Sequence, residues 1–491
     1  MTKIASIICL LMLFGCQSKQ KSSNEPFEQL SKSVDQYATN ILSRGNINSM
    51  SVAIYKNGSS YHNYYGTVDS VSKKPLTNQS LFEIASISKV FTGSLMAKAI
   101  LDKKLTLDND IREFLPRTYP NLEFEGTPVT IKNIVTHTLG FETPKKLKNV
   151  YSKIFSGEYA KNPIVYTLED LFDELETTTL SHAPGTFYAY NNVGPEIAAY
   201  ILEQVYKKPY PELLSDFFKE IGMENSYLQD YEQHKDHLIQ GYTESGELAM
   251  IGKNPLLGGA SGIITTLPDL MKFLQYQLEA KQPFIKEATR TLFENKEEKL
   301  GYFWDVGYAE EEGFYYLKTG TSNGVQSILL VCPDANYGQI LLMNNTSEKA
   351  VNDWISLYNK IEYDLIKFPK INLWSQVEPL FLKNSKEASK QYLALKKDTV
   401  HYFATANYLN RVGYDFLSQE QTALAIDVFK LAISTDPENA NLYDSLGEAY
   451  YKAKQYKKAK ESYENVLKLD PNNTNAKKNS NEINLILEHR N

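Results

Sequence analysis

The sequence predicts an α+β body that contains an antiparallel sheet, followed by a tail built only from helices. Three observations support this prediction. Strand-like runs lie near both ends of the first 366 residues, helix-like stretches lie between them, and a repeat with a 34-residue period begins after residue 400. In such an α+β arrangement, we expect the first and last strands to be neighbours in one sheet.

Composition limits the class of protein. Of the 491 residues, 42% are hydrophobic and 23% are charged, which is typical of globular chains and excludes wholesale disorder, collagen and multi-span membrane proteins. The net charge of −7 gives no support to nucleic-acid binding. The three cysteines are too few for a disulfide scaffold. Cys332 lies in a strand-like run and is expected to be a buried, inert thiol.

Residues 1–15 are predicted to be a signal peptide. Lys3 provides a positive start, and the apolar run 4–14 is too short to span a bilayer of about 30 Å as a helix. The run ends in Leu13-Phe14-Gly15-Cys16, which resembles the lipobox of bacterial lipoproteins. The resemblance implies cleavage before Cys16, lipidation of this cysteine and a membrane anchor. Residues 16–30 are expected to be a tether.

The residue after the lipidated cysteine, Gln17, favours the periplasmic side of the outer membrane by the same resemblance. The protein would then be a lipid-anchored component of the cell envelope. The alternative is a plain secretory signal with an incidental cysteine.

The body is expected to extend over residues 31–366. Strands 50–55 and 60–65 are joined through Asn57-Gly58, a strong hairpin signal. The other expected elements, assigned from apolar periodicity, are helices 27–43, 87–100, 193–205 and 268–278 and strands 325–331 and 339–343. Residues 367–400 are expected to form a helical connector.

Residues 401–491 contain the repeat. At eight positions, a residue of the same class occurs again 34 residues later, and this period resembles the tetratricopeptide repeat. The first set is Leu409, Val412, Gly413, Phe416, Ala425, Phe429, Ala432 and Pro437. The second set is Tyr443, Leu446, Gly447, Tyr450, Ala459, Tyr463, Val466 and Pro471. Glycines would let paired helices approach closely, and prolines would end the second helix of each unit. The preceding segment and residues 474–487 are expected to cap the stack. A structural spacer and a groove for a protein or peptide partner both remain open.

The first candidate for chemistry is Ser86 with Lys89. At i and i+3 of a helix the two side chains share one face, and a lysine with a lowered pKa can help a serine to attack a carbonyl group. The spacing is not specific, because it also occurs at Ser18/Lys21 and Ser70/Lys73. Only the copy at Ser86 opens a helix after an apolar stretch, which makes it the candidate nucleophile.

Two further motifs accompany this pair. Tyr190 and Asn192 follow a Pro-Gly turn and precede a helix-like stretch, so Tyr190 is a candidate general base if neighbouring cations lower its pKa. Lys318, Thr319 and Gly320 precede the strand 325–331. A lysine, a hydroxyl and a glycine at that place can bind a carboxylate and let a substrate backbone approach.

Together, Ser-x-x-Lys, Tyr-x-Asn and Lys-Thr-Gly occur in the order found in serine β-lactamases and penicillin-binding proteins. The chain most resembles class C β-lactamases and related D-Ala-D-Ala peptidases and esterases, over about residues 35–365. The strings that reinforce the resemblance are 82–93, 105–116, 135–138 and 301–304. The resemblance implies a β-lactamase/transpeptidase-like antiparallel sheet with a helical subdomain.

The resemblance also implies roles. Ser86 would be acylated, Lys89 would assist proton transfer and Tyr190 would be the general base. Asn192 would orient the substrate amide and Lys89, and Lys318 would hold Tyr190 electrostatically and attract a substrate carboxylate, beside Thr319 and Gly320. Backbone N–H groups of Ser86 and Thr321 would form the oxyanion hole. The mechanism requires no metal and no cofactor.

The sequence departs from the family at three places, which concern the substrate rather than the catalytic groups. Leu139-Gly140 replaces a Ser-Gly pair, Ser261-Gly262 replaces a Gly-Gly pair, and residues 142–180 have no recognisable pattern and could narrow the cleft. Lys318 is retained where esterase-like relatives often have histidine. Peptides ending in D-alanine are therefore the first expected substrate, β-lactams the second and small esters or D-amino-acid peptides the third.

Competing chemistry has weak support. His234 and His237 could hold a metal with Asp230 and Glu232, although a solvated charged loop is favoured. His137 could serve a serine triad, but the family resemblance makes it structural and hydrogen-bonded. No Walker loop and no Gly-x-Gly-x-x-Gly motif after a strand is present. A non-catalytic envelope scaffold whose tail recruits a partner is the alternative to a serine hydrolase.

Overall fold

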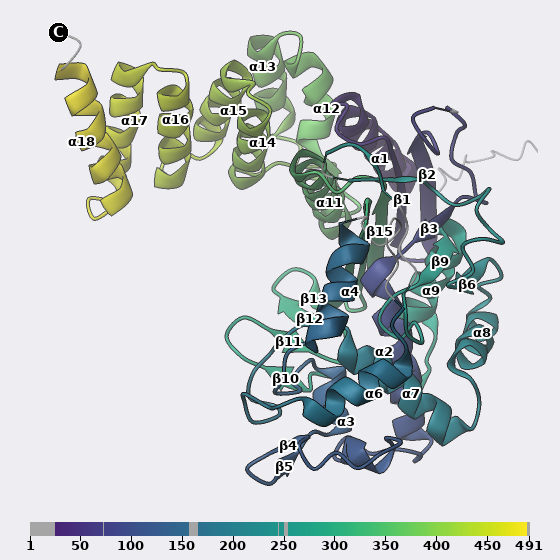
Figure 1. Cartoon of the computed structure of the whole chain (residues 1–491). Coiled ribbons are helices and arrows are strands. Elements are labelled where there is room, and N and C mark those ends of the chain that lie inside the picture. Colours follow the sequence, from purple (N-terminus) through teal and green to yellow (C-terminus); the bar gives the residue numbers. More distant parts are fainter. Residues whose placement is uncertain (1–24, 72, 157–164, 244, 250–253, 489–491) are drawn as a thin grey trace, which may run out of the picture.

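The computed structural model describes residues 25–71, 73–156, 165–243, 245–249 and 254–488. A body with a sheet and several layers of helices carries a row of antiparallel helices that extends away from one side (Figure 1). This arrangement confirms the predicted α+β body and helical tail.

The main sheet has eight antiparallel strands in the order β10-β11-β12-β13-β14-β15-β1-β2. The predicted neighbours are confirmed, because Met50 in β1 pairs with Met343 in β15. The bounds of the strands are Ser49–Lys56 (β1), Ser59–Gly66 (β2), Phe293–Glu294 (β10), Lys299–Leu300 (β11), Asp305–Ala309 (β12), Gly313–Ser322 (β13), Val325–Cys332 (β14) and Tyr337–Met343 (β15).

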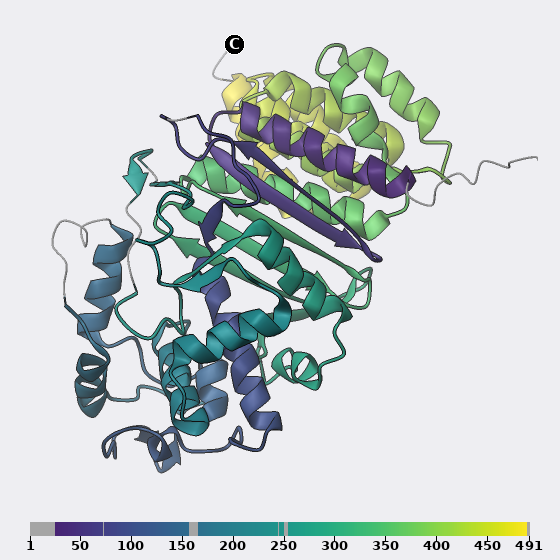
Figure 2. The ribbon, with the colours of Figure 1, turned by 90° about the vertical axis from the view of Figure 1, so that its right-hand side faces the viewer.

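Helices cover both faces of the sheet, which is why every residue of β1, β14 and β15 is buried. Helices α1 (Glu25–Ser43) and α11 (Glu348–Lys367) share a core with one face. Helix α9 (Leu267–Glu279) contacts the other. In Figure 2, α1 lies between the sheet and the helices of the tail. Helix α1 begins earlier than the expected end of the tether at residue 30, because Phe27 and Leu30 are buried.

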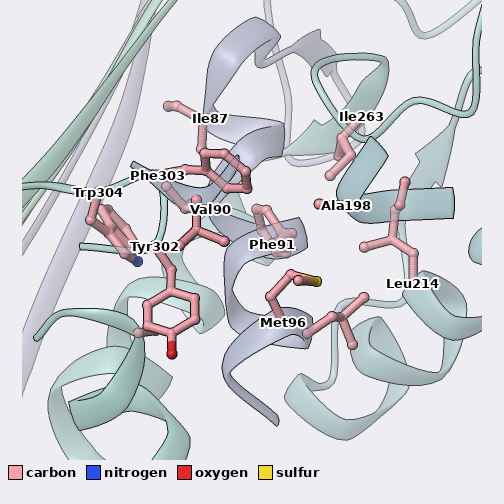
Figure 3. Packing of buried hydrophobic residues seen from close by; sticks show 14 of the residues in the cluster. Ile87, Val90, Phe91, Met96, Ala198, Leu214, Ile263, Tyr302, Phe303 and Trp304 are labelled. Atoms are coloured by element: carbon pink, nitrogen blue, oxygen red, sulfur yellow. The ribbon is translucent and has the colours of Figure 1, made fainter. Parts of the chain in front are cut away.

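A helical layer packs beside the sheet around α2 (Ser88–Leu101). This helix is buried on nearly all sides, by α7 (Val193–Tyr206), α8 (Tyr210–Ile221) and the segment 302–304 (Figure 3). Phe91 stacks on Phe273 with ring centroids 4.1 Å apart. The other elements of this layer are η1 (Ala85–Ile87), η2 (Ile111–Glu113), α3 (Ile131–Val135), α4 (Lys145–Phe155), α6 (Leu168–Thr177) and α10 (Pro283–Ala288).

Short strands complete the body. Strands β3 (Leu81–Glu83), β9 (Ile263–Thr266) and β6 (Ser226–Leu228) form a three-stranded sheet in that order. The remaining strands pair as β4 (Glu123–Phe124) with β5 (Thr127–Pro128) and β7 (Gly241–Tyr242) with β8 (Leu248–Ala249). The three-stranded sheet leads directly into the turn that carries Ser86.

The repeat tail consists of helical hairpins. The hairpins are α14 (Ala406–Ser418) with α15 (Thr422–Thr435) and α16 (Ala440–Lys452) with α17 (Tyr456–Leu469), and α18 (Thr474–Glu488) covers the end. A Cβ on Gly413 would lie 2.3 Å from the Phe429 ring, so the glycine permits the predicted close approach. The connector holds α12 (Leu373–Phe381) and α13 (Ser385–Leu395), and β16 (Ile371–Asn372) pairs with β17 (Tyr402–Phe403).

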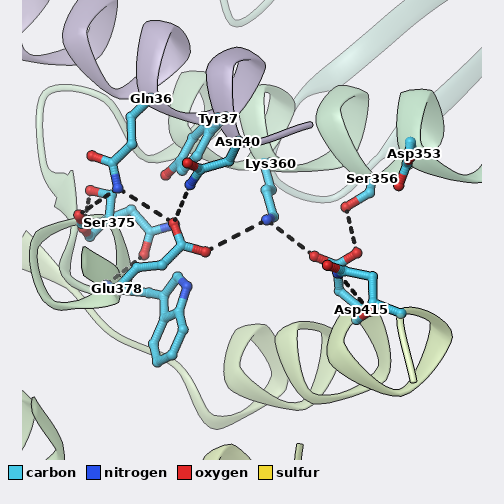
Figure 4. Close-up of polar contacts among 12 residues, drawn as sticks. Gln36, Tyr37, Asn40, Asp353, Ser356, Lys360, Ser375, Glu378 and Asp415 are labelled. Carbon is cyan, nitrogen blue, oxygen red and sulfur yellow. Dashed lines mark hydrogen bonds and ion pairs between the residues drawn. The ribbon is translucent and has the colours of Figure 1, made fainter. Parts of the chain in front are cut away.

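Buried charges join the repeat tail to the body (Figure 4). Lys360 on α11 lies 3.2 Å from Asp415 on α14 and 3.9 Å from Glu378 on α12. Arg44, after α1, contacts Asp415 at 3.0 Å and also pairs with Asp353. Three elements of the body and connector therefore meet the first repeat helix through one ionic network.

Every helix in the described ranges is too short or too polar to cross a membrane. The predicted signal peptide and Cys16 lie outside the described residues.

Candidate active site

Ser86 lies on a tight turn between β3 and α2. The residue before it, Ala85, has φ +47°, a left-handed conformation that is costly for a residue with a Cβ. The turn is held from both sides, since Ile84 N–H donates to Ile263 O and Ser327 Oγ donates to Ile84 O. The surrounding strands thus fix a strained backbone at the candidate nucleophile.

The hydroxyl of Ser86 contacts two functional side chains. Lys89 Nζ lies 2.9 Å from Ser86 Oγ, one turn along α2, and the hydroxyl of Tyr190 lies 2.7 Å from the same oxygen. Three residues from two of the predicted motifs therefore meet at one atom, although Tyr190 is 104 positions away in the chain.

Lys89 is a buried amine. Desolvation lowers the pKa of Lys89 from 10.5 to about 7, and the charge of Glu196 opposes this shift. A lysine with this pKa is substantially neutral near pH 7, so it can accept a proton. Its second partner is the carbonyl oxygen of Ala260 at 2.8 Å.

Glu196 organises the loop that carries Ala260. The carboxylate, fully buried in the first turn of α7, accepts backbone N–H bonds from Gly258, Gly259 and Ala260 and a side-chain bond from Asn254. Four donors satisfy a carboxylate that would otherwise be costly to bury. The loop and its carbonyl oxygen are thereby fixed against Lys89.

Tyr190 lies between two lysines. Lys89 Nζ and Lys318 Nζ are 5.0 Å and 5.2 Å from the centre of its ring. Burial nevertheless raises the pKa of Tyr190 above 10.0, against the lowering effects of Lys318 and of the bond to Ser86. Lys318 does lower this pKa, but desolvation outweighs it, so the condition under which Tyr190 would be a general base is not met. Tyr190 is therefore a neutral phenol that donates to Ser86.

Strand β13 places the Lys-Thr-Gly motif beside the nucleophile. Lys318 is buried and pairs with Asp305 on β12 at 3.2 Å. Thr319 and Thr321 alternate with Lys318 along the strand and line the cavity. A Cβ on Gly320 would lie 2.3 Å from Ile84 O and 3.0 Å from Ser86 N, so only glycine permits the strand to lie this close to the turn.

A cavity of about 400 Å³ opens at Ser86. It is lined by the predicted site residues Ser86, Tyr190, Asn192, Thr319 and Thr321, together with Asn191, Thr143, Lys148 and Tyr151. The last three lie in residues 142–180, the segment without a recognisable pattern. Its helix α4 thus forms part of the cavity wall.

His137 lies behind Tyr190 rather than beside Ser86. Its ring centre is 4.7 Å from that of Tyr190 and 5.2 Å from that of Phe303. Burial, reinforced by Lys318 and Lys89, lowers its pKa well below 6.5. Within the described part of the chain neither ring nitrogen has a hydrogen-bond partner, so the expected hydrogen bond of this imidazole is not formed. The packing of His137 instead supports the ring of Tyr190.

Other candidates lie apart from the cavity. Cys332 is a buried free cysteine. His234 stacks on Tyr227 with ring centres 3.7 Å apart and lies 3.7 Å from Asp230. The described residues contain no group of three or more histidine, cysteine or acidic side chains placed to hold a metal ion.

Residues 34–358 match the family model described as Beta-lactamase. The match covers more than half of the chain, which therefore belongs to the Beta-lactamase family. Residues 440–473 match the tetratricopeptide repeat model, which confirms the predicted kind of repeat in the tail.

Among curated relatives, Protein flp of Staphylococcus aureus (strain N315) is 24% identical over 327 residues, which cover 64% of this chain and 63% of the relative. A β-lactamase of Pseudomonas fluorescens is 24% identical over 249 residues, which cover 50% of this chain and 64% of the relative. The chain thus spans less than two thirds of the length of these relatives.

Solved structures share the fold of the body. A class C β-lactamase aligns with TM-score 0.59 and 23% identity, over 70% of this chain and 98% of that chain. The β-lactamase/D-alanine carboxypeptidase from Yersinia pestis aligns with TM-score 0.60 and 21% identity, over 70% of this chain and 99% of that chain. These alignments confirm the predicted β-lactamase/transpeptidase-like fold.

Sequence reasoning missed several residues around Ser86. Glu196 had a detectable signal, because it is the one acid in an otherwise apolar helical stretch, 193–202. Asp305 and Ala260 gave no such signal, since their roles depend on strand pairing and on a loop carbonyl. Lys148 and Tyr151 share a helix face, but nothing in the sequence places α4 at the cavity.

Proposed function

We propose that this protein is a serine hydrolase that forms an acyl-enzyme at Ser86. The observation that supports this function best is the pair of contacts at Ser86 Oγ, with Lys89 Nζ at 2.9 Å and the Tyr190 hydroxyl at 2.7 Å. A serine beside a base and a second proton-transfer group is the arrangement that nucleophilic catalysis requires.

In the proposed first step, neutral Lys89 accepts the hydroxyl proton of Ser86 as Ser86 Oγ bonds to the substrate carbonyl carbon. The charge on the carbonyl oxygen is held by the backbone N–H groups of Ser86 and Thr321, and one such donor is typically worth about 10²–10³ in rate. The phenol of Tyr190 then donates its proton to the leaving nitrogen or oxygen, the carbon–leaving-group bond breaks, and protonated Lys89 restores the phenol.

A water molecule completes the cycle. It loses a proton to neutral Lys89 and attacks the acyl carbon. Ser86 Oγ then leaves with the phenol proton of Tyr190, and protonated Lys89 restores the phenol. Asn192 lines the cavity and is proposed to bind the substrate amide. This sequence of steps needs neither a metal nor a cofactor.

Peptides that end in D-alanine are the first proposed substrate, β-lactams the second and small esters the third. Thr319 on β13 lines the cavity and supports a substrate with a carboxylate, because its hydroxyl can bond an extended peptide that lies beside this strand. The fold shared with a structure described as a β-lactamase/D-alanine carboxypeptidase is consistent with this order.

The test is the intact mass of the mature protein after mixing with a penicillin, beside Ser86→Ala. Loss of a serine nucleophile can cost about 10⁶ in rate, so an adduct is expected only with Ser86. An adduct that persists for hours indicates a penicillin-binding peptidase, and rapid turnover indicates a β-lactamase. A folded protein that neither penicillins nor ester probes acylate would contradict the proposal and favour a non-catalytic scaffold.

We also propose that Cys16 anchors the protein in the cell envelope, with the repeat tail acting as a spacer or as a site for a protein partner. The lipobox-like sequence before Cys16 supports the anchor. Membrane fractionation of cells that express the wild type and Cys16→Ser tests it. Release of only the variant into the soluble fraction is expected, and equal retention of both would contradict the anchor.

A further inference from the structure

We propose that helix α4 adds a subsite for a negatively charged group on the acyl part of the substrate. The subsite consists of Lys148 and Tyr151 on α4, with Thr143 just before the helix. This inference rests on the proposed acyl transfer at Ser86, whose substrate class it narrows.

Helix α4 forms a wall of the cavity that holds the nucleophile. Lys148 and Tyr151 are three residues apart, so they lie on one helix face, and both line the cavity together with Ser86. Tyr151 also lines a small adjoining cavity of about 30 Å³ with Ile154 and Asn192. A substrate bound at Ser86 therefore passes beside this face.

The position of the proton donor Tyr190 indicates which part of the substrate lies along α4. The leaving group must receive a proton from Tyr190, which lies beside Lys318 and β13. The remaining part of the substrate then extends toward Asn192, Thr143 and α4. This part stays attached to Ser86 after the first step.

Lys148 is the one cationic side chain among the described residues that line this cavity. Lys318 is buried and neutralised by Asp305. The side chain of Lys148, by contrast, is 69% exposed. Among the described residues it forms an ion pair with Glu142 alone, at 3.4 Å, and the Glu142 side chain is 81% exposed. A surface pair of this kind is worth about 0–1 kcal/mol, so a substrate carboxylate can replace Glu142.

The charge of α4 as a whole favours an anion. Its sequence, KKLKNVYSKIF, contains four lysines and no acidic residue. The field of several like charges at the edge of a cleft raises the local concentration of oppositely charged substrates. A neutral or cationic group at this place would gain nothing from these charges.

Tyr151 supplies a hydrogen-bond donor that the described residues leave unused. Tyr151 is only 9% exposed, and its buried hydroxyl has no partner among the described residues. Burial raises its pKa well above 10.0, so it remains a neutral donor. Because an unpartnered buried hydroxyl is unfavourable, an acceptor oxygen of the substrate would stabilise the complex.

The experiment compares benzylpenicillin with its analogue that carries a carboxylate on the benzylic carbon of the acyl side chain. Equilibrium binding is measured by calorimetry to Ser86→Ala protein, which needs no chemistry. The ratio of the two dissociation constants is expected to favour the carboxylated compound. Adding Lys148→Glu should reverse this preference, with a change of about fivefold or more in the ratio, the factor that about 1 kcal/mol gives.

The matched control is Lys145→Glu, the same charge change on the same helix at a residue that does not line the cavity. The ratio of the two dissociation constants for this variant is expected to stay within about twofold of the ratio for the Ser86→Ala protein. Tyr151→Phe removes a donor from the same subsite and should weaken binding of the carboxylated compound more than that of benzylpenicillin.

A ratio that is insensitive to Lys148→Glu, or that Lys145→Glu changes equally, would overturn the subsite, as would the failure of both compounds to bind. Acylation of Ser86 in the wild type is measured separately by intact mass. Preferential binding without acylation would support the subsite and contradict the proposed hydrolase.

Discussion

At the scale of single residues, Ser86 differs from an ordinary serine through the groups around its hydroxyl. Lys89 and Tyr190 both contact Ser86 Oγ, and burial moves their pKa values in opposite senses, toward a neutral amine and a neutral phenol. Two neutral groups avoid the cost of isolated buried charges. The two groups also have different proposed roles, since the amine accepts a proton and the phenol donates one.

The pKa of Lys89 predicts the pH dependence of acylation. With a pKa of about 7, the neutral fraction rises from about one tenth at pH 6 to about nine tenths at pH 8. The acylation rate constant should therefore increase about tenfold over this range and then level off. Rate constants from intact mass at a series of pH values measure it. A rate that is flat between pH 6 and 8 would contradict Lys89 as the base.

Glu196 allows a second prediction about the rise of the acylation rate with pH. Its negative charge raises the pKa of Lys89. Glu196→Gln should therefore lower that pKa, so that the acylation rate rises at a lower pH. The amide of glutamine also repels one of the N–H groups of 258–260, which should reduce the maximal rate about tenfold or more. Acylation rates across pH measure both effects.

Glu203→Gln is the control, because this residue lies on the same helix and accepts a hydrogen bond from the backbone N–H of Tyr210. Its profile should match that of the wild type. If Glu196→Gln lowers the acylation rate but leaves the pH at which the rate rises unchanged, Glu196 supports the fold without affecting the pKa of Lys89.

At the scale of elements, β13 and the turn at Ser86 act as one unit. The backbone of Gly320 lies so close to the turn that a Cβ would overlap Ile84 O and approach Ser86 N. Gly320→Ala should therefore push the strand away from the nucleophile and slow acylation about 100-fold or more, as expected when an oxyanion donor is displaced. Thermal unfolding should show a loss of about 1–3 kcal/mol from overpacking.

A substitution on the neighbouring strand separates the local effect from general damage to the sheet. Tyr308 on β12 is largely exposed, so Tyr308→Ala should leave acylation unchanged. If Gly320→Ala acylates as fast as this control, the close approach of β13 is not needed for catalysis.

The two repeats offer an internal comparison of glycine packing. A Cβ on Gly413 would lie 2.3 Å from Phe429, whereas one on Gly447 would lie 3.0 Å from Tyr463. Alanine favours a helix over glycine by about 1 kcal/mol, which opposes the cost of the contact. Gly413→Ala should therefore destabilise the tail more than Gly447→Ala. Urea unfolding followed by circular dichroism measures the difference, and the reverse order would show that the first repeat relaxes more easily.

Long periodic elements were predictable from the sequence, and short ones were not. The predicted strand 50–55 is observed as Ser49–Lys56 and the predicted helix 193–205 as Val193–Tyr206, since each has a clear apolar pattern. Strands β10 and β11 have two residues each and leave no period to detect. For the same reason the site was predicted at its motifs but not at Glu196 or α4, whose roles arise from tertiary contacts.

At the scale of the whole molecule, an ionic network at α11 joins the body to the repeat tail. Lys360 is 7% exposed and lies between Glu378 and Asp415. Although burial raises the pKa of Asp415, Lys360 and Arg44 hold it at about 2. A carboxyl group with this depressed pKa stabilises the fold above about pH 4, and the contribution is lost as the pH falls toward 2.

Lys360→Met should uncouple the tail from the body. The variant leaves two buried carboxylates with fewer cations, and breaking a buried pair typically costs about 3–5 kcal/mol. Calorimetry should then show the transition of the tail separating from that of the body and moving to lower temperature. Acylation of Ser86 should persist, because the active-site cavity is built from residues of the body.

Lys390→Met provides the matched control, since Lys390 pairs with Glu387 at the surface with side chains 68% and 58% exposed. An exposed pair contributes about 0–1 kcal/mol, so this variant should unfold as the wild type does. Identical unfolding of the Lys360 and Lys390 variants would show that apolar packing alone joins the tail to the body. A separate transition in Lys360→Met alone would mean that buried charges fix the direction in which the repeats extend from the active site.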